Sequence, residues 1–173
     1  TYFGSGLSSI VFQEIRESKS LAYSAYAYYS SGRKADDLNY TQAYVGTQAN
    51  KLPEAVDAML DLMNNMPRAE KQFEAAKLAT LKKIAAQRIT KSNIFWRYES
   101  LKRRGIDYDN RKDIYKEVEG MNMDELQGFF DENIKGGKYT ALVIGDRKAL
   151  DMKALEKLGE VKELDVDYLF NHK

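Results

Sequence analysis

The chain has 173 residues, a length that suits one domain, and 43% of them are hydrophobic, which is enough apolar material for a core. Basic and acidic side chains nearly cancel to a net charge of +1, so no overall field favours nucleic acid or an anionic membrane. The absence of cysteine excludes disulfides, thiolate zinc sites and cysteine nucleophiles, and no apolar run reaches the ~18 residues of a membrane span.

The N-terminal part of the chain predicts one helix and a β-hairpin. After the turn at Gly4-Ser5-Gly6, apolar residues recur at helical spacing and predict a helix over residues 6–18. A tyrosine- and alanine-rich stretch predicts a strand over 20–31, and a polar turn at 32–37 joins it to a second strand over 38–49. Alternation along the first strand places five residues on one face: Leu21, Tyr23, Ala25, Ala27 and Tyr29.

Two helices are predicted to follow the hairpin. The first opens at residues 51–54, where an early proline is tolerated, and stops near Met66. The second and longer helix covers residues 69–90, and its periodicity points four side chains inward: Phe73, Leu81, Ile84 and Ala85.

A polar loop separates the next two predicted helices. The first covers residues 93–104 and ends at Gly105, because glycine is the residue type that favours a left-handed helix C-cap. The polar loop covers residues 106–113. Asn122 then has the position and the side chain of a helix N-cap, and it predicts a helix over 123–135.

The C-terminal part predicts two more strands around a short helix. The apolar stretch 138–145 is typical of a buried strand, 150–158 of a helix and 161–164 of an edge strand. The whole order of elements predicts an α+β fold in which helices are layered on an antiparallel-rich mixed sheet. We expect residues 1–173 to form a single domain.

Residues 82–104 differ from the rest of the chain in charge. They hold eight basic side chains and one acidic side chain, a local charge of +7 that leaves −6 elsewhere. Phe95, Trp96 and Tyr98 lie among these charges, a combination that nucleic-acid-binding proteins use. The favoured interpretation places the aromatic rings in the core and the charges in water. Nucleic-acid binding and a positive wall facing an acidic or extended peptide are the alternatives.

The chain lacks the residues of a local catalytic centre. Catalytic zinc normally takes three protein ligands, whereas the single histidine, His172, is the residue before last. Nucleophile pairs of histidine with serine or cysteine are unsupported for the same reason. We therefore expect neither a metal site nor a catalytic residue in this chain.

The segment from residue 4 to residue 25 is the most distinctive, GSGLSSIVFQEIRESKSLAYSA. A glycine-rich turn opens a helix of the form S-S-x-L/V-F-x-x-I/L-R-E, and a short link leads to G/A-Y-S at the start of a strand. This order resembles the C-terminal-type domain of the pitrilysin or insulinase-like zinc peptidases, and the likeness extends over nearly the whole chain. Ser20 departs from it, because relatives often have glycine there. Relatives also have an opening strand and part of a helix before the glycine turn, so the likeness implies an excised domain.

The resemblance implies a fold and a function for two residues. The fold is that of the metallohydrolase domain of pitrilysin-like and mitochondrial-processing-type peptidases. One half-unit of the family carries zinc on an inverted His-x-x-Glu-His motif, which this chain lacks. The other supplies an arginine and a tyrosine seven positions apart, which correspond here to Arg16 and Tyr23 and would hold a substrate oxygen. From the residues alone, Arg16 also suits a helix-end ion pair with Glu14 or Glu17.

The resulting hypothesis is the non-catalytic, substrate-binding domain of a zinc-dependent metalloendopeptidase. Its expected partners are a peptide or protein substrate and a zinc-binding half-unit, either in the same parent chain or in a partner subunit. No nucleic acid is expected. The alternative is a proteolytically inactive relative that serves as a scaffold, as core subunits of respiratory complexes do. The sequence selects no compartment, since cytoplasm, periplasm and bacterial cell envelope all fit.

Overall fold

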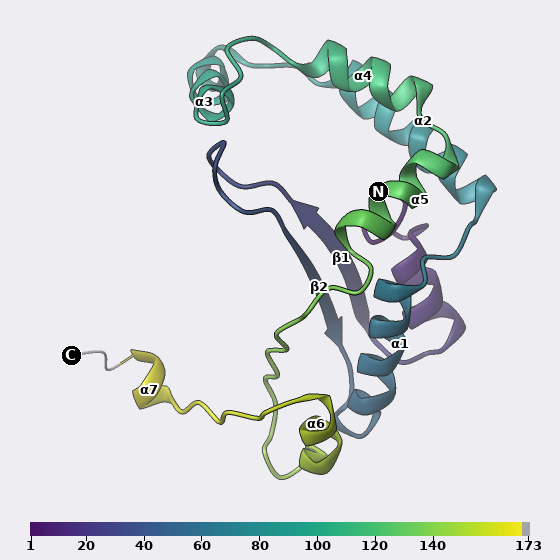
Figure 1. Ribbon diagram of the computed structural model, residues 1–173, viewed down its shortest axis with the longest axis vertical. Coiled ribbons are helices and arrows are strands. Elements are labelled where there is room, and N and C mark those ends of the chain that lie inside the picture. The colour runs from purple at the N-terminus through teal and green to yellow at the C-terminus, as the bar shows by residue number, and fades with distance from the viewer. Residues whose placement is uncertain (171–173) are drawn as a thin grey trace.

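A computed structural model describes residues 1–170 of the chain and has an α+β architecture (Figure 1). Its sheet is a hairpin of two antiparallel strands, β1 (Ser24–Ser30) and β2 (Tyr40–Gly46). Helices lie along the hairpin and continue past its tip (Figure 1). The predicted α+β class is confirmed, although the sheet formed by the described residues is smaller than the sequence predicts.

The helical elements surround this hairpin in chain order. A π-helix, η1 (Phe12–Ser18), precedes β1, and a 3-10 turn, η2 (Ala49–Lys51), leads from β2 into α1 (Leu52–Asn64). The remaining helices are α2 (Glu70–Ala86), α3 (Lys91–Lys102), α4 (Arg111–Gly120), α5 (Met123–Asn133), α6 (Met152–Leu158) and α7 (Val166–Phe170). The sequence does not predict α4, a highly charged helix that runs alongside α2 (Figure 1).

The N-terminal segment is fixed against β1 by backbone hydrogen bonds. The Ala27 N–H donates to the Gly4 carbonyl at 2.9 Å, and the Val11 N–H donates to the Phe3 carbonyl at 2.9 Å. A Cβ atom on Gly4 would lie 2.2 Å from the Ala27 carbonyl oxygen, so only glycine permits this approach. The first glycine of the turn is therefore a packing requirement of the hairpin.

The hairpin buries one face and exposes the other. Ala25 and Ala27 of β1 are buried and Tyr29 is half-buried, whereas Tyr26 and Tyr28 on the opposite face are exposed. The predicted alternation is thus confirmed within the strand. Tyr23 is the exception, because β1 begins one residue later and the Tyr23 side chain lies in solvent.

The core lies between the inner face of the hairpin, η1, α1 and parts of α2 and α5. In α1 the buried residues follow helical spacing and form one continuous stripe toward the hairpin. The buried apolar residues in the described part of the chain are Tyr2, Ile10, Val11, Ile15, Leu21, Ala25, Ala27, Ala55, Ala58, Met59, Leu62, Met63, Met66, Phe73, Met123, Phe130 and Ile134. Of the inward positions predicted for the long helix, only Phe73 is buried; Ala85 is exposed.

Two predicted strands do not form. Residues 138–145 run as an irregular, mostly exposed segment, and no backbone hydrogen bond joins them to β1 or β2. Residues 161–164 are likewise outside any ladder. An apolar alternation becomes a strand only where a neighbouring strand satisfies its N–H and C=O groups, and the described residues provide none for these two segments.

The interpretation that the aromatic rings of residues 82–104 face the core is wrong. Helix α3 has no buried residue, and Ile94, Phe95, Trp96 and Tyr98 are all exposed. Three of these apolar residues are consecutive, so they point to different sides of the helix and no single face can bury them. Figure 1 places α3 beyond the hairpin tip, where the Ala35 N–H donates to the carbonyl of Arg103 at 3.1 Å.

Two predicted helix ends are confirmed. The side chain of Asn122 accepts a hydrogen bond from the Glu125 N–H at 2.9 Å, and the Glu125 carboxylate accepts one from the Asn122 N–H at 2.8 Å, which completes a capping box at α5. Gly105 follows α3 with a φ of 76°, in the left-handed region that glycine adopts without strain.

Candidate functional site

Arg16 lies in the last turn of η1, with its side chain 44% exposed. The neighbouring Ile15 is fully buried and anchors this turn to the core. The Arg16 guanidinium stands 4.8 Å from the centre of the Phe12 ring, and its Nε lies 3.7 Å from the Glu17 carboxylate. The ion pair with Glu17 is long and exposed, so it occupies little of the hydrogen-bonding capacity of the guanidinium. A π-helix is a rare form that is found frequently at functional sites.

Tyr23 directly precedes β1, and its side chain is 73% exposed. Its backbone is fixed, because the Tyr23 N–H donates to the Gly46 carbonyl at 2.8 Å. The phenol oxygen accepts a hydrogen bond from Gln48 Nε2 at 3.3 Å. Within residues 1–170 no acceptor takes the hydroxyl proton of Tyr23, so this proton is available to a ligand.

The link between these two residues has a constrained backbone. Ser20 has a φ of 50°, in the left-handed region that glycine adopts far more readily than serine. The Ser20 carbonyl accepts a hydrogen bond from Lys51 Nζ at 3.0 Å, and the Leu21 carbonyl accepts one from the Thr47 hydroxyl. Thr47, which follows β2, and Lys51 of η2 thus hold the link in its left-handed conformation. This conformation explains why glycine suits the Ser20 position.

Arg16 and Tyr23 therefore lie on either side of one rigid link, and both side chains reach solvent. In the described part of the chain no hydrogen bond, ion pair or ring contact joins them. The pair offers hydrogen-bond donors for a carbonyl or carboxylate oxygen and no nucleophile. Their joint action on one ligand stays a prediction.

The outer face of the hairpin carries an aromatic surface. Tyr26 stacks on Tyr44 of β2 with ring centres 5.0 Å apart, and on Tyr28 at 6.3 Å. The Tyr28 hydroxyl donates to the side-chain oxygen of Gln42 at 2.6 Å. These contacts hold exposed rings in fixed positions along the strands, which gives a flat wall with polar edges.

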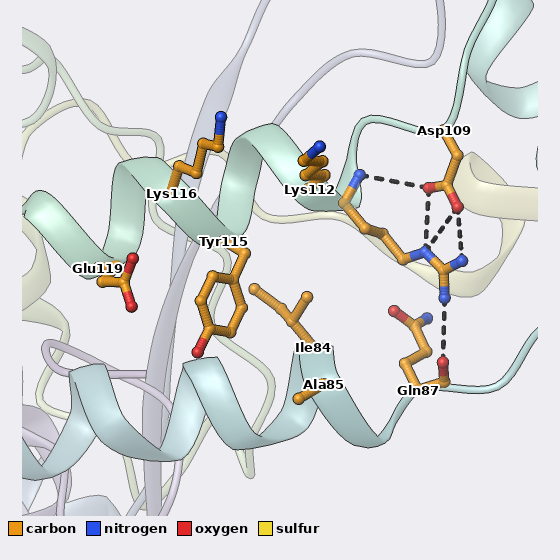
Figure 2. Close-up of a pocket in the computed structure, with 9 residues that line it drawn as sticks. Ile84, Ala85, Gln87, Asp109, Lys112, Tyr115, Lys116 and Glu119 are labelled. Carbon is orange, nitrogen blue, oxygen red and sulfur yellow. Dashed lines mark hydrogen bonds and ion pairs between the residues drawn. The ribbon is translucent and has the colours of Figure 1, made fainter.

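A second polar cluster, which the sequence does not predict, lies where α2, α3 and α4 meet. Asp109 accepts hydrogen bonds from Arg111 Nε at 2.9 Å and from Arg97 Nη2 at 3.3 Å, while Arg111 Nη1 donates to the Gln87 carbonyl at 3.0 Å. In Figure 2, dashed lines mark the hydrogen bonds made at Asp109 and Gln87, and the labelled Tyr115 side chain points from α4 toward α2. The only sequence signal was the Asp-x-Arg spacing before a charged helix.

The arginine contacts decide what Asp109 can do. Hydrogen bonds from the Arg111 side chain, aided by the Arg97 side chain, hold the pKa of Asp109 well below its usual range. Asp109 is therefore ionised at neutral pH and acts as an anchor between helices, not as a proton donor. It borders an open pocket of about 530 Å³ whose wall includes Tyr115, Lys116 and Glu119 (Figure 2).

The described residues supply no metal site. Between residues 1 and 170, no three histidine, cysteine, aspartate or glutamate side chains are grouped so that they could hold a metal ion. His172 lies outside the described residues. None of the helices in the same range combines the length and the apolar composition needed to cross a membrane.

Comparison with known proteins finds a family match for the first half of the chain. Residues 1–85 match the family described as the Peptidase M16 inactive domain. The chain is also 35% identical over 77 residues to a protein named "Uncharacterized zinc protease YmxG" from Bacillus subtilis (strain 168). That similarity covers 43% of this chain and spans only 18% of the relative. Residues 1–85, which hold Arg16, Tyr23 and most of the core, are thus similar to the inactive, C-terminal-type domain of the pitrilysin/insulinase-like M16 peptidases.

Proposed function

We propose that this domain is the non-catalytic, substrate-binding half of a zinc-dependent metallopeptidase and that Arg16 and Tyr23 hold an extended peptide in it. One observation carries the proposal. Both side chains present hydrogen-bond donors to solvent from fixed backbone positions, on either side of a constrained link, within the part that matches the M16 inactive domain. Donors fixed in this way can hold a ligand oxygen without losing much conformational freedom.

The chemistry of the two groups suits a peptide carbonyl. The Arg16 guanidinium brings a full positive charge with several N–H donors, and the Tyr23 hydroxyl brings one more donor. Both stabilise an oxygen that gains negative charge more than they stabilise the neutral carbonyl, which is the condition for lowering a reaction barrier. The catalytic centre itself belongs to another half-unit, in the same parent chain or in a partner subunit, and zinc is expected there.

The aromatic wall on the outer face of the same hairpin offers the peptide a further surface. Tyr26, Tyr28 and Tyr44 are exposed and held by their mutual stacking. An extended peptide alternates its side chains, so one set can lie on these rings while the backbone oxygens meet Arg16 and Tyr23. The proposed ligand is therefore a peptide segment rather than a small molecule.

The test is peptide turnover by the assembled protein, which contains this domain and the zinc-bearing half-unit. We expect Arg16→Ala and Tyr23→Phe each to lower kcat/KM by roughly 100-fold, as removal of one oxyanion donor does. The melting temperature of each variant should stay near that of the parent, because neither side chain is buried.

Matched control variants separate this role from general surface effects. Tyr40→Phe removes an exposed tyrosine hydroxyl from the same hairpin, and Arg147→Ala removes an exposed arginine that pairs with Glu163 as Arg16 pairs with Glu17. Both controls should keep parental turnover. If Arg16→Ala and Tyr23→Phe also keep parental turnover, the substrate-gripping role is wrong. If the assembled protein cleaves no peptide at all, the result would instead favour the alternative of a proteolytically inactive scaffold.

A further inference from the structure

A second pocket, of about 480 Å³, lies between α3, the link that follows α2 and the first turn of α4. Three arginines and the only tryptophan of the chain contribute to its wall, together with two asparagines: Arg88, Trp96, Arg97, Arg104, Asn93 and Asn110. None of the residues that line it is acidic. The pocket lies in the basic segment 82–104, whose local charge is +7.

The arginines of this pocket are poorly neutralised by the chain itself. Arg88 and Arg104 make no ion pair with any described residue. Arg97 shares Asp109 with Arg111, and its buried Nε finds no acceptor among residues 1–170. Guanidinium groups left in this state gain most from a ligand that carries carboxylates or other anionic oxygens.

Trp96 adds an apolar surface to the positive charge. Its side chain is 67% exposed, and it packs edge-on against Phe95 with ring centres 5.1 Å apart. Exposed tryptophan and unpaired arginine together match a ligand that places an anionic group next to an aromatic or apolar group. The chain offers no such group to this pocket from its own lining residues.

We propose that this pocket binds an acidic, aromatic-containing stretch of the peptide substrate and forms a second binding site in addition to Arg16 and Tyr23. Carboxylates bind Arg88 and Arg104, and an aromatic or apolar side chain packs on Trp96. The peptide nature of the ligand rests on the proposed function. Only three of the eight basic residues of 82–104 line the pocket, which suits a few carboxylates better than a continuous phosphate backbone.

The position of the pocket implies a minimum substrate length. Tyr23 lies at the base of β1, whereas α3 lies beyond the hairpin tip, where Ala35 is bonded to Arg103 (Figure 1). A strand of this length spans about 20 Å, at roughly 3.3 Å per residue. An extended peptide therefore needs at least about six residues to reach from Tyr23 to the pocket. The second site therefore raises the affinity for long substrates and does not contribute to the binding of short ones.

Trp96 supplies the readout for the test, because its fluorescence is the only tryptophan signal of the chain. The isolated chain is titrated with a tryptophan-free peptide of about ten residues that contains aspartate, glutamate and phenylalanine. Parallel titrations use the same peptide with asparagine and glutamine in place of the acids, and a decauridylate. We expect the acidic peptide to change the fluorescence and to bind about tenfold more tightly than the amide peptide, since charge-assisted hydrogen bonds are lost.

Two variants locate the binding. Arg104→Gln should weaken the acidic peptide about tenfold, whereas Arg103→Gln, which removes the same charge one position away but does not line the pocket, should weaken it less than about twofold. Equal losses in both variants would overturn the proposal in favour of a diffuse positive field. Tighter binding of decauridylate, with displacement of the peptide, would overturn it in favour of nucleic acid. The titration needs no turnover, so its outcome is independent of the Arg16 and Tyr23 test.

Discussion

The two halves of this molecule bury their apolar residues to very different extents. Of the seventeen core residues buried among residues 1–170, fourteen precede residue 85, where the match to the M16 inactive domain ends. The other three, Met123, Phe130 and Ile134, come from α5 and the residue just after it. Helices α3, α4 and α6 contribute none. The matched half thus carries nearly the whole core, and the second half is attached mainly through α2 and α5.

The physical difference is visible in two helices. In α1 the apolar residues recur at helical spacing and form one stripe, so a core on one side of the helix can bury them together. In α3 they surround the helix, and polar contacts such as Asp109 with Arg97 fix its position. Core packing should therefore govern the stability of the first half, and exposed polar contacts that of the second.

The largest test of this contrast is a pair of phenylalanine variants. Phe73 is 4% exposed and Phe95 is 59% exposed. Phe73→Ala should lower the free energy of unfolding by about 3–5 kcal/mol, as core truncations of this residue do. Phe95→Ala should change it by less than about 0.5 kcal/mol. Urea denaturation of both variants measures the difference, and equal losses would show that α3 packs in a second core.

A pair of glycine variants tests the same contrast in the backbone. Gly4→Ala places a methyl group against the Ala27 carbonyl and should cost roughly 2–3 kcal/mol, as overpacking does. Gly128→Ala in α5 meets no atom within 4 Å and should stabilise the protein by about 0.5–1 kcal/mol, because alanine favours the helix. Thermal unfolding should move in opposite directions for the two. A shift in the same direction would contradict the proposed close approach at Gly4.

The link at Ser20 gives a smaller effect within the first half. Ser20→Val should cost about 1–2 kcal/mol, because a branched side chain resists the left-handed backbone. Ser20→Gly should stay within about 1 kcal/mol of the parent, since relief of strain offsets the greater freedom of the unfolded chain. Chemical denaturation measures the free energy of unfolding of both variants. If Ser20→Val is as stable as the parent, the link is not held in this conformation.

The smallest effect concerns Asp109 in the second half. Its pKa is lowered from the usual value of 3.8, so its ion pairs stabilise the fold above that pH and are lost on further acidification. The carboxylate is partly exposed and solvent screens it, so Asp109→Asn should cost no more than about 1 kcal/mol at neutral pH. The difference from the parent should shrink below about pH 4. A difference that persists at lower pH would contradict this role.

The sequence predicts features that rest on local signals better than features that depend on distant neighbours. Alternation placed Ala25 and Ala27 inside, and the capping side chain of Asn122 located the start of α5, because both signals are local. The predicted strand at 138–145 needs a neighbouring strand, and the predicted burial of Trp96 needs a packing partner. The described residues supply neither. The Asp109 cluster joins three helices, so spacing along the chain does not reveal it.

The candidate site also combines a local sequence signal with features that only the structure shows. Arg16 and Tyr23 were found through a resemblance of the segment around them, not through their own chemistry. The structure adds what the pattern does not contain, namely the fixed link at Ser20 and a Tyr23 hydroxyl proton that no residue of 1–170 accepts. For the pocket at Trp96, the sequence shows only that basic and aromatic residues occur together. A buried helix and an exposed helix would share this composition, so the sequence does not reveal the pocket.

The unpaired segment 138–145 also affects the behaviour of the protein at high concentration. Its central residues, Tyr-Thr-Ala-Leu-Val-Ile at 139–144, are uncharged, free of proline and rich in residues that favour strands. Leu142 and Ile144 are exposed. Such a stretch can pair with its copy in another molecule and start aggregation, unless flanking charges oppose it. Lys138 on one side and Asp146, Arg147 and Lys148 on the other are placed to act as gatekeepers against this self-association.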